Sequence, residues 1–167
     1  MIDFEIKKVL FIDLDGTLIK TISGKTFPED ITDFRIQLPV LDKIKETFPN
    51  LSYFFIVTNQ GGIGKFISEA DFGTKIDAIS DLCFFYLIER RLTMYYDYLY
   101  CASNDKDNPY RKPNTGMLEK LYYNHNLHYN KQEMIGDASG KPGDFSDKKC
   151  AENFGIDYID VRDFLEL

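Results

Sequence analysis

The chain has 167 residues, of which 44% are apolar and 28% are charged, which is enough for one ordinary domain with its own core. Its 27 acidic residues outnumber its 20 basic ones, giving a net charge of -7. This charge argues against nonspecific binding along nucleic acid, although local contacts with a few phosphates remain open. No apolar run approaches the roughly 18 residues of a membrane span, and the start MIDFEIKK lacks the apolar core of a secretory signal.

Cysteine and histidine are scarce in this sequence. The three cysteines, Cys83, Cys101 and Cys150, are an odd number and form no CxxC pair, which excludes a disulfide scaffold and a cysteine-based zinc site and indicates a reducing compartment. Only two histidines occur, His125 and His128, so a catalytic metal should be held by oxygen ligands. We therefore expect an intracellular protein, and the sequence does not decide between the nucleus and the cytoplasm.

Short apolar runs alternate with helical patterns along the chain. Strands that alternate with helices indicate an α/β fold, in which a mostly parallel sheet has helices on both faces and ligands bind beyond the carboxyl ends of the strands. No repeat or linker divides the sequence, so we expect one domain over residues 1–167. In chain order, the predicted elements are a strand at Val9–Asp13, a helix at Pro39–Thr47, a strand at Tyr53–Thr58, a helix at Glu69–Arg90 capped by Ser68, a strand at Tyr95–Cys101, a helix at Gly116–Asn124, a strand at Met134–Ile135, a helix at Asp147–Asn153 and a strand at Tyr158–Ile159.

Residues 19–38 fit neither pattern. Ser23 and Gly24 form a turn signal, and Pro28 interrupts regular structure. We interpret this segment as a small hairpin, or flap, over the end of the first strand. A plain surface loop is an equal alternative on length alone.

The strongest chemical signal is the segment DLDGT at Asp13–Thr17, directly after the first apolar strand. Two carboxylates one residue apart, followed by a turn at Gly16, can reach one pocket. One of them can attack phosphorus as a nucleophile, while the other protonates the leaving oxygen and later activates water. A divalent cation would lower the cost of holding both acids beside a phosphate dianion. The alternative, a solvated acidic turn, fits poorly with the apolar strand that precedes it.

This DxDGT segment resembles the first motif of the haloacid dehalogenase superfamily, whose phosphatases form an aspartyl-phosphate. The other three motifs follow in order, because Thr58 is similar to the hydroxyl of the second, Lys112 to the lysine of the third, and Asp137 with Asp147 to the acids of the fourth. The resemblance implies a three-layer Rossmann-like fold with only a minimal cap.

The same resemblance implies a role for each motif residue. Asp13 is expected to be the nucleophile and Asp15 the acid and base, while Thr58 and Lys112 contact the transferred phosphoryl group. Mg²⁺ is the expected cofactor. Its expected ligands are Asp13, Asp15 through its carbonyl oxygen, Asp137 and Asp147.

Longer segments are similar to one branch of this superfamily, the polynucleotide 3′-phosphatases. The likeness covers roughly residues 8–160, and no GxxxxGK[ST] loop of a kinase domain occurs, so the chain resembles the stand-alone phosphatase form. The segments that carry it are Ile19–Pro28, Asp33–Ile36, Thr58–Lys65, Tyr110–Met117, Gly136–Lys141 and Asp144–Ser146.

One site residue is ambiguous. The stretch between Gly140 and Asp147 is shorter than in many members of that family, which leaves Asp144 as an alternative second acid of the fourth motif. The helical spacing of Asp147, Ala151 and Gly155 favours Asp147. For the acid not chosen, helix capping is an equal interpretation.

The resemblance implies that the substrate is a DNA 3′ end, processed during repair. The short insertions leave the site open, which suits the end of a polymer. The backbone near Asn59 is expected to contact the phosphoryl group, and Arg111 is the strongest candidate for a flanking phosphate, because its planar fork suits phosphate oxygens. Further candidates are Lys25, Arg35 and Lys65, although a solvated surface charge is the simpler interpretation of any one of them.

Two other functions stay open. The first is a small-molecule phosphatase of the histidinol-phosphate or heptose-bisphosphate type, although nothing here matches the Cys/His zinc loop that is common in that group. The second is a non-enzymatic binding module, against which the intact acids argue. The sequence does not choose between DNA and RNA. We expect a monomer that uses no nucleotide cofactor and no membrane partner.

Overall fold

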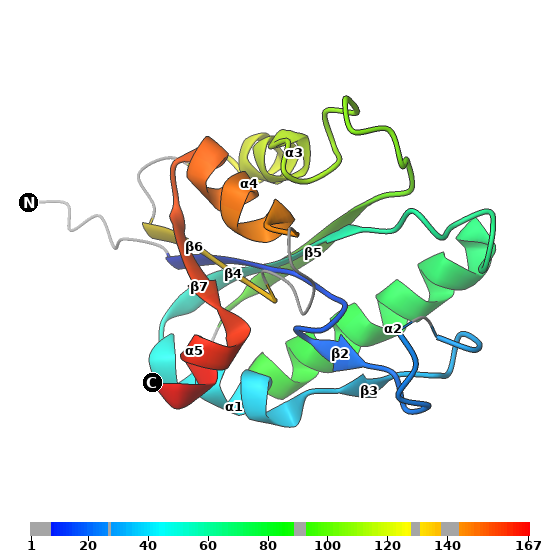
Figure 1. The fold of residues 1–167 in the computed structure, drawn as a ribbon. Helices are drawn as coiled ribbons and strands as arrows, with labels where there is room; N and C mark the ends of the chain where they lie inside the picture. Colours follow the sequence, from blue (N-terminus) through cyan, green and yellow to red (C-terminus); the bar gives the residue numbers. More distant parts are fainter. Residues whose placement is uncertain (1–7, 27, 89–92, 128–130, 138–143) are drawn as a thin grey trace, which may run out of the picture.

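The computed structural model describes residues 8–26, 28–88, 93–127, 131–137 and 144–167. Their centre is a five-stranded, wholly parallel sheet with the strand order β5-β4-β1-β6-β7, so the first strand of the chain lies in the middle (Figure 1). The strands are β1 (Lys8–Ile12), β4 (Leu51–Asn59), β5 (Tyr95–Cys101), β6 (Lys131–Gly136) and β7 (Asp157–Asp160).

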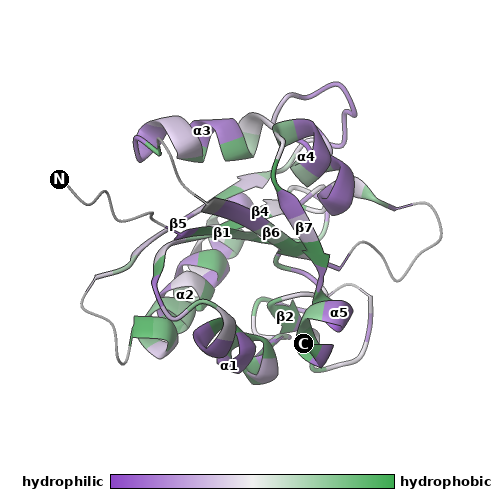
Figure 2. Ribbon diagram, turned by 90° about the vertical axis from the view of Figure 1, so that its left-hand side faces the viewer, coloured by the Kyte–Doolittle hydropathy of each residue, from purple (hydrophilic) through white to green (hydrophobic). Residues whose placement is uncertain are grey.

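Helices cover both faces of the sheet. Figure 2 shows α1 (Leu38–Thr47), α2 (Glu69–Ile88) and α5 (Val161–Glu166) on one face, and α3 (Gly116–Asn124) and α4 (Ser146–Phe154) on the other. Alternate residues of a strand point to opposite faces. Accordingly, Leu10 and Ile12 pack in the core on the α1 and α2 side, while Val9 and Phe11 pack in the core on the α3 and α4 side. The predicted three-layer α/β fold is confirmed.

The predicted elements match the observed ones within a few residues. The strand predicted at Tyr95–Cys101 and the helix predicted at Gly116–Asn124 have the predicted bounds. Ser68 caps α2 as expected, since its Oγ accepts a hydrogen bond from the backbone nitrogen of Asp71 at 3.0 Å. Arg90, the predicted end of that helix, lies outside the described residues.

Helix α5 was not predicted from the sequence. It has only six residues, which is too short for a periodic apolar pattern. Its start is fixed by Asp160, whose side chain accepts a hydrogen bond from the backbone nitrogen of Arg162 at 2.9 Å. Its buried residues, Val161 and Phe164, seal the core at the edge of the sheet.

The segment after β1 forms the expected flap. Strands β2 (Ile19–Lys20) and β3 (Arg35–Ile36) pair antiparallel, so a hairpin rather than a plain loop is present. Buried Asp33 holds the tip of this hairpin, because its carboxylate accepts hydrogen bonds from the nitrogen and hydroxyl of Ser23 and from the nitrogen of Glu29. After β4 the next element is α2, and the described residues contain no separate cap domain.

The topology brings the chemically interesting residues to one edge of the sheet. Strands β4, β1 and β6 are neighbours and parallel, so their carboxyl ends meet side by side. Asp13 follows β1, Thr58 and Asn59 end β4, and Asp137 follows β6. Among the described residues, no helix combines the length and the apolar character that crossing a bilayer requires.

Candidate active site

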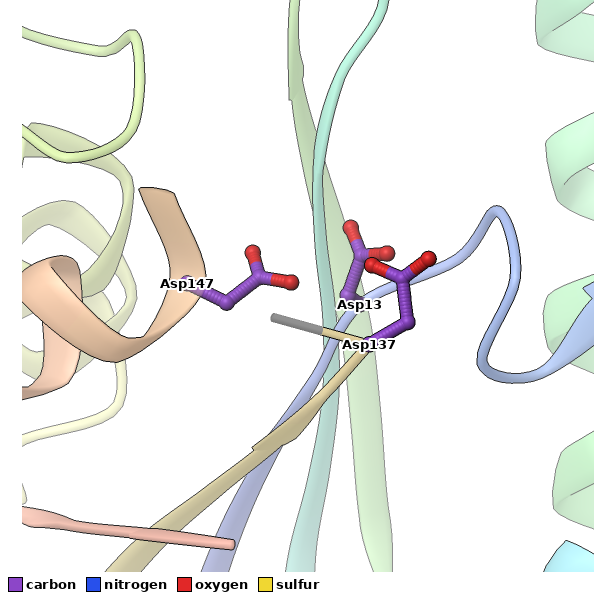
Figure 3. A group of neighbouring side chains, drawn as sticks. All are labelled: Asp13, Asp137 and Asp147. Atoms are coloured by element: carbon purple, nitrogen blue, oxygen red, sulfur yellow. The ribbon is translucent and has the colours of Figure 1, made fainter. Parts of the chain in front are cut away.

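Three carboxylates converge at this edge of the sheet. Asp13 and Asp137 follow the neighbouring strands β1 and β6, and Asp147 reaches in from the first turn of α4 (Figure 3). One oxygen of each lies within 4.8 Å of one oxygen of each of the others. The structure thus brings Asp147 into the cluster, whereas Asp144 is exposed and accepts a hydrogen bond from the backbone nitrogen of Ser146 at 3.1 Å.

Lys112 supplies the positive charge of the site. Its Nζ donates hydrogen bonds to Oδ1 of Asp13 at 2.7 Å, to Oδ1 of Asp147 at 2.6 Å and to the carbonyl oxygen of Val57 at 2.8 Å. These three bonds use every proton of the ammonium group, and the residue is only 3% exposed. Burial alone would lower the pKa of Lys112, but the two carboxylates outweigh it and raise that pKa.

The side chain of Asn59 fixes the backbone of Lys112. Its Nδ2 donates to the carbonyl oxygen of Lys112, and its Oδ1 accepts from the nitrogen of Lys112, both at 2.9 Å. This reciprocal pair joins the end of β4 to a loop more than fifty residues later, and it aims the lysine side chain at Asp13. The side chain of Asn59 therefore positions Lys112, in addition to any contact that its backbone makes with substrate.

Two glycines allow the acids to approach the backbone. Gly16 has a positive φ of 82°, and a Cβ there would collide with the carboxylate of Asp137. A Cβ on Gly136 would collide with the carboxylate of Asp147. The glycines in the DLDGT and Gly-Asp segments therefore create the space that the cluster occupies.

The cluster suits a hard divalent cation. Burial and the nearby charge of Asp147 raise the pKa of Asp13 well above its usual range, with Lys112 opposing. The same two causes, again opposed by Lys112, raise the pKa of Asp137 to about 6. A single lysine does not neutralise three converging carboxylates, so a cation held by their oxygens would relieve this repulsion. No cluster with Cys or His ligands occurs among the described residues.

Asp15 lies apart from this cluster and is connected to Thr58 through Gln60. The amide nitrogen of Gln60 donates to Oδ2 of Asp15 at 2.5 Å and to Oγ1 of Thr58 at 2.9 Å. Thr58 is buried and Asp15 is exposed, so Gln60 links the inner and outer parts of the site. Sequence reasoning missed Gln60, although it stands in the quoted Thr58–Lys65 segment, because an amide side chain has no reaction chemistry of its own.

Comparison with known proteins agrees with this geometry. The model of a protein family described as polynucleotide kinase 3 phosphatase matches residues 8–164 of the chain. The chain belongs to this family. The sequence-based expectation of a polynucleotide phosphatase family is thereby confirmed.

Two curated relatives of the family domain are bifunctional proteins. The chain is 36% identical to the bifunctional polynucleotide phosphatase/kinase of Schizosaccharomyces pombe, over 95% of this chain and 37% of that protein. It is 33% identical to the histidine biosynthesis bifunctional protein HisB of Legionella pneumophila, over 93% of this chain and 41% of that protein. The chain therefore spans about two fifths of the length of these relatives.

A solved structure supports the fold. The D,D-heptose 1,7-bisphosphate phosphatase of B. bronchiseptica, solved in complex with magnesium and phosphate, superimposes with a TM-score of 0.67 at 17% sequence identity, over 90% of this chain and 78% of that one. At this identity the comparison shows the α/β architecture alone.

Four basic side chains are expected from the sequence to contact phosphates of the substrate. They are Arg111, Lys25, Lys65 and Arg35. Arg111 is half-buried, and its Nη1 donates to the carbonyl oxygen of Ser103 at 2.8 Å, within the loop that joins β5 to α3. Lys25 forms an ion pair with Glu29 within the flap. Lys65 and Arg35 are exposed and make no ion pair with any described residue. The structure does not gather these four side chains around the carboxylate cluster.

A groove of about 630 Å³ opens beside Asp15. Its floor near the site is formed by Asp15, Asn59 and Gln60, one wall by the flap and the other by the start of α2. The flap residues are Thr26 and Pro28–Ile31, and the residues on the α2 side include Phe66–Ser68, Asp71, Phe72 and Lys75. This volume is in the range of small-molecule binding sites.

Proposed function

We propose that this chain is a magnesium-dependent polynucleotide 3′-phosphatase, which removes 3′-phosphate from DNA strand ends through an aspartyl-phosphate on Asp13 and serves DNA repair. The observation that carries the proposal is the buried contact of Lys112 with Asp13 inside a three-carboxylate cluster. A carboxylate can meet a phosphate dianion only where positive charge cancels their repulsion, and this arrangement supplies such a place.

In the first half of the reaction, Asp13 attacks the phosphorus atom. Lys112 holds Oδ1 of Asp13, and Oδ2 accepts no hydrogen bond from the described residues, so Oδ2 is the attacking atom. The bond between phosphorus and the 3′ oxygen breaks, and Asp15 gives its proton to that oxygen. Oγ1 of Thr58 accepts a hydrogen bond from Gln60, which leaves the hydroxyl proton available for an equatorial phosphoryl oxygen.

In the second half, water hydrolyses the aspartyl-phosphate. Asp15 has lost its proton and removes one from the water, whose oxygen bonds to phosphorus while the bond to Asp13 breaks. Inorganic phosphate leaves, and both acids return to their starting states. The hydrogen bond from Gln60 keeps the Asp15 carboxylate at the mouth of the site through both halves.

Magnesium would be held by carboxylate oxygens of Asp13, Asp137 and Asp147, together with the Asp15 carbonyl oxygen expected from the resemblance. When bound, it supplies charge stabilisation for the phosphoryl oxygens. The oxygen-only donor set and the two glycines that make room for the acids fit a hard cation of this kind. The magnesium in the heptose bisphosphatase structure gives independent support for a metal in this fold.

A nucleic-acid substrate is supported by the family and by the shape of the site. The matching family model and the fission-yeast relative both concern polynucleotide phosphatases. The flap, as far as the structure describes it, is only a two-stranded β-hairpin. The 3′ end of a DNA strand could therefore reach Asp13 without a domain closing over the site. The net charge of -7 favours contact with few phosphates, and hence a weak dependence of binding on salt.

A small-molecule phosphatase is the second candidate, because the HisB relative is nearly as similar in sequence. Against it, the described residues contain no Cys/His cluster, and the three cysteines are buried in α2, β5 and α4.

A substrate panel tests the proposal. The purified protein is offered a 3′-phosphorylated DNA oligonucleotide, its 5′-phosphorylated counterpart, histidinol phosphate and an aryl phosphate, each with and without magnesium. We expect the highest kcat/KM for the 3′-phosphorylated oligonucleotide and no turnover after chelation. Preference for histidinol phosphate would favour the second candidate, and inertness towards all four substrates would favour a binding module.

A further inference from the structure

The groove beside Asp15 lies where the leaving group of the reaction must be. In the proposed function, on which this inference rests, Asp15 gives its proton to the departing 3′ oxygen. The remainder of the terminal nucleotide is therefore on the Asp15 side of the phosphoryl group. The groove starts at Asp15 and Gln60 and continues between the flap and α2.

Lys75 of α2 is an unusual residue in this groove. It is only 5% exposed, yet its ammonium group makes no hydrogen bond and no ion pair with the described residues. The ring of Phe34 lies beside it, with its centroid 5.5 Å from Nζ. A cation–π contact at that distance is weak, so the ammonium group has no strong partner among the described residues and borders the groove. Three donor positions thus remain for an acceptor from outside the chain.

The charge of the groove argues against a backbone phosphate as that acceptor. The other charged side chains lining it are all acidic: Asp15, Glu29, Asp30 and Asp71. A phosphodiester anion would meet four carboxylates and one lysine. A neutral group with lone pairs, such as the carbonyl oxygen or ring nitrogen of a nucleobase, can accept from Lys75 without that repulsion.

The walls of the groove also suit a flat ring. Phe66 and Phe72 line the α2 side, and Pro28 and Ile31 line the flap side. The Phe66 side chain is largely exposed, at 74%, and adds apolar surface at the rim of the groove. We propose that this groove holds the nucleobase of the 3′-terminal nucleotide and that Lys75 donates a hydrogen bond to an acceptor on that base.

Four substrates separate the base from the backbone phosphate. They are thymidine 3′-phosphate, a dithymidylate with a 3′-phosphate, and the two matching compounds in which a tetrahydrofuran abasic residue carries the 3′-phosphate. We expect the wild-type protein to lose about tenfold to a hundredfold in kcat/KM when the base is removed, in the mononucleotide as well as the dinucleotide, because a hydrogen bond from a charged donor is lost.

The Lys75→Met variant tests the residue, because methionine keeps the volume and removes the charge. We expect it to reduce the base-to-abasic ratio of kcat/KM by about tenfold. Thermal unfolding should be nearly unchanged, since the ammonium group makes no hydrogen bond and no ion pair with the described residues. The control is Lys149→Met, on the exposed surface of α4, which should leave the ratio unchanged.

Each outcome decides the matter. A wild-type protein that hydrolyses base and abasic substrates equally overturns the inference, as does a Lys75→Met protein that keeps the full base preference. A loss in Lys75→Met that appears only with dinucleotides would assign Lys75 to a backbone phosphate and also overturn it. Inertness towards all 3′-phosphates with turnover of histidinol phosphate would instead refute the proposed function.

Discussion

The amide nitrogen of Gln60 lies 2.5 Å from Oδ2 of Asp15 and is the only described donor to that carboxylate oxygen. The same nitrogen donates to Thr58 at 2.9 Å. A residue without reaction chemistry thus sets the position of the proposed acid relative to Thr58, the residue proposed to contact the phosphoryl group.

Replacing Gln60 by methionine should lower kcat by about tenfold to a hundredfold and leave KM nearly unchanged, because the acid loses its orientation while substrate contacts remain. Steady-state kinetics with a 3′-phosphorylated oligonucleotide measures both constants. Gln37→Met, at the residue that precedes α1, is the control with wild-type rates. A Gln60→Met protein with unchanged kcat would remove the positioning role.

Asparagine at Asp13 should abolish turnover, lowering kcat by about 10³-fold or more, since the amide cannot act as the nucleophile. Asparagine at Asp15 should lower kcat by about 10² to 10⁴-fold through loss of acid–base catalysis. Asp107→Asn, at an exposed position in the loop after β5, is the matched control. Full activity of purified Asp13→Asn protein would refute the nucleophile assignment.

Methionine at Lys112 should lower the free energy of unfolding by about 3–5 kcal/mol, because Asp13 and Asp147 would remain buried without their counter-charge. Urea unfolding monitored by circular dichroism in the absence of metal measures the change. Adding Asp147→Asn to Lys112→Met should restore part of the loss, because one of the two unpaired carboxylates is then neutral. Simple additivity of the two substitutions would contradict this coupling.

Asparagine at Asp137 should raise the metal-free Tm by a few degrees, since one of three mutually repelling carboxylates becomes neutral. Magnesium should raise the Tm of the wild-type protein by binding only the folded state, and the variant should show little of this rise. Differential scanning calorimetry with and without magnesium measures both shifts. Equal magnesium responses in the two proteins would place the metal elsewhere.

The flap should lose stability in acid through Asp33. Hydrogen bonds from Ser23 and Glu29 lower the pKa of Asp33 to about 2. A carboxyl whose folded-state pKa is depressed stabilises the fold above its unfolded pKa, near 4, and this contribution is lost as the pH falls towards 2. The Tm difference between wild-type and Asp33→Asn proteins should therefore be full at pH 7 and smaller at pH 3. A difference that grows in acid would have the wrong sign.

The sheet and most of the site could be predicted because their signals are local. Asp13 and Asp137 each follow an apolar strand, and parallel strands place such residues at one edge. The choice of Asp147 over Asp144 rested on helical spacing, and the structure places Asp147 in the carboxylate cluster. Helix α5 could not be predicted, because its six residues are too few to show a helical period of apolar residues.

Other features could not be predicted because they depend on tertiary contacts. The sequence drew attention to the backbone at Asn59, whereas its side chain binds a loop that only the folded chain brings near. The direction of a surface side chain has no sequence signature, so the tie from Arg111 to Ser103 was not foreseen. The burial of Lys75 could not be predicted either, because a lysine in a helix is usually exposed to solvent.

The central place of β1 has a consequence during translation. Its partners β4 and β6 are synthesised in that order, and β6 ends at Gly136, late in the chain. Until the ribosome has released β6, one side of β1 keeps an open row of backbone donors and acceptors beside apolar residues. Such an edge invites pairing with another nascent chain, so this protein should depend on chaperones at high rates of expression.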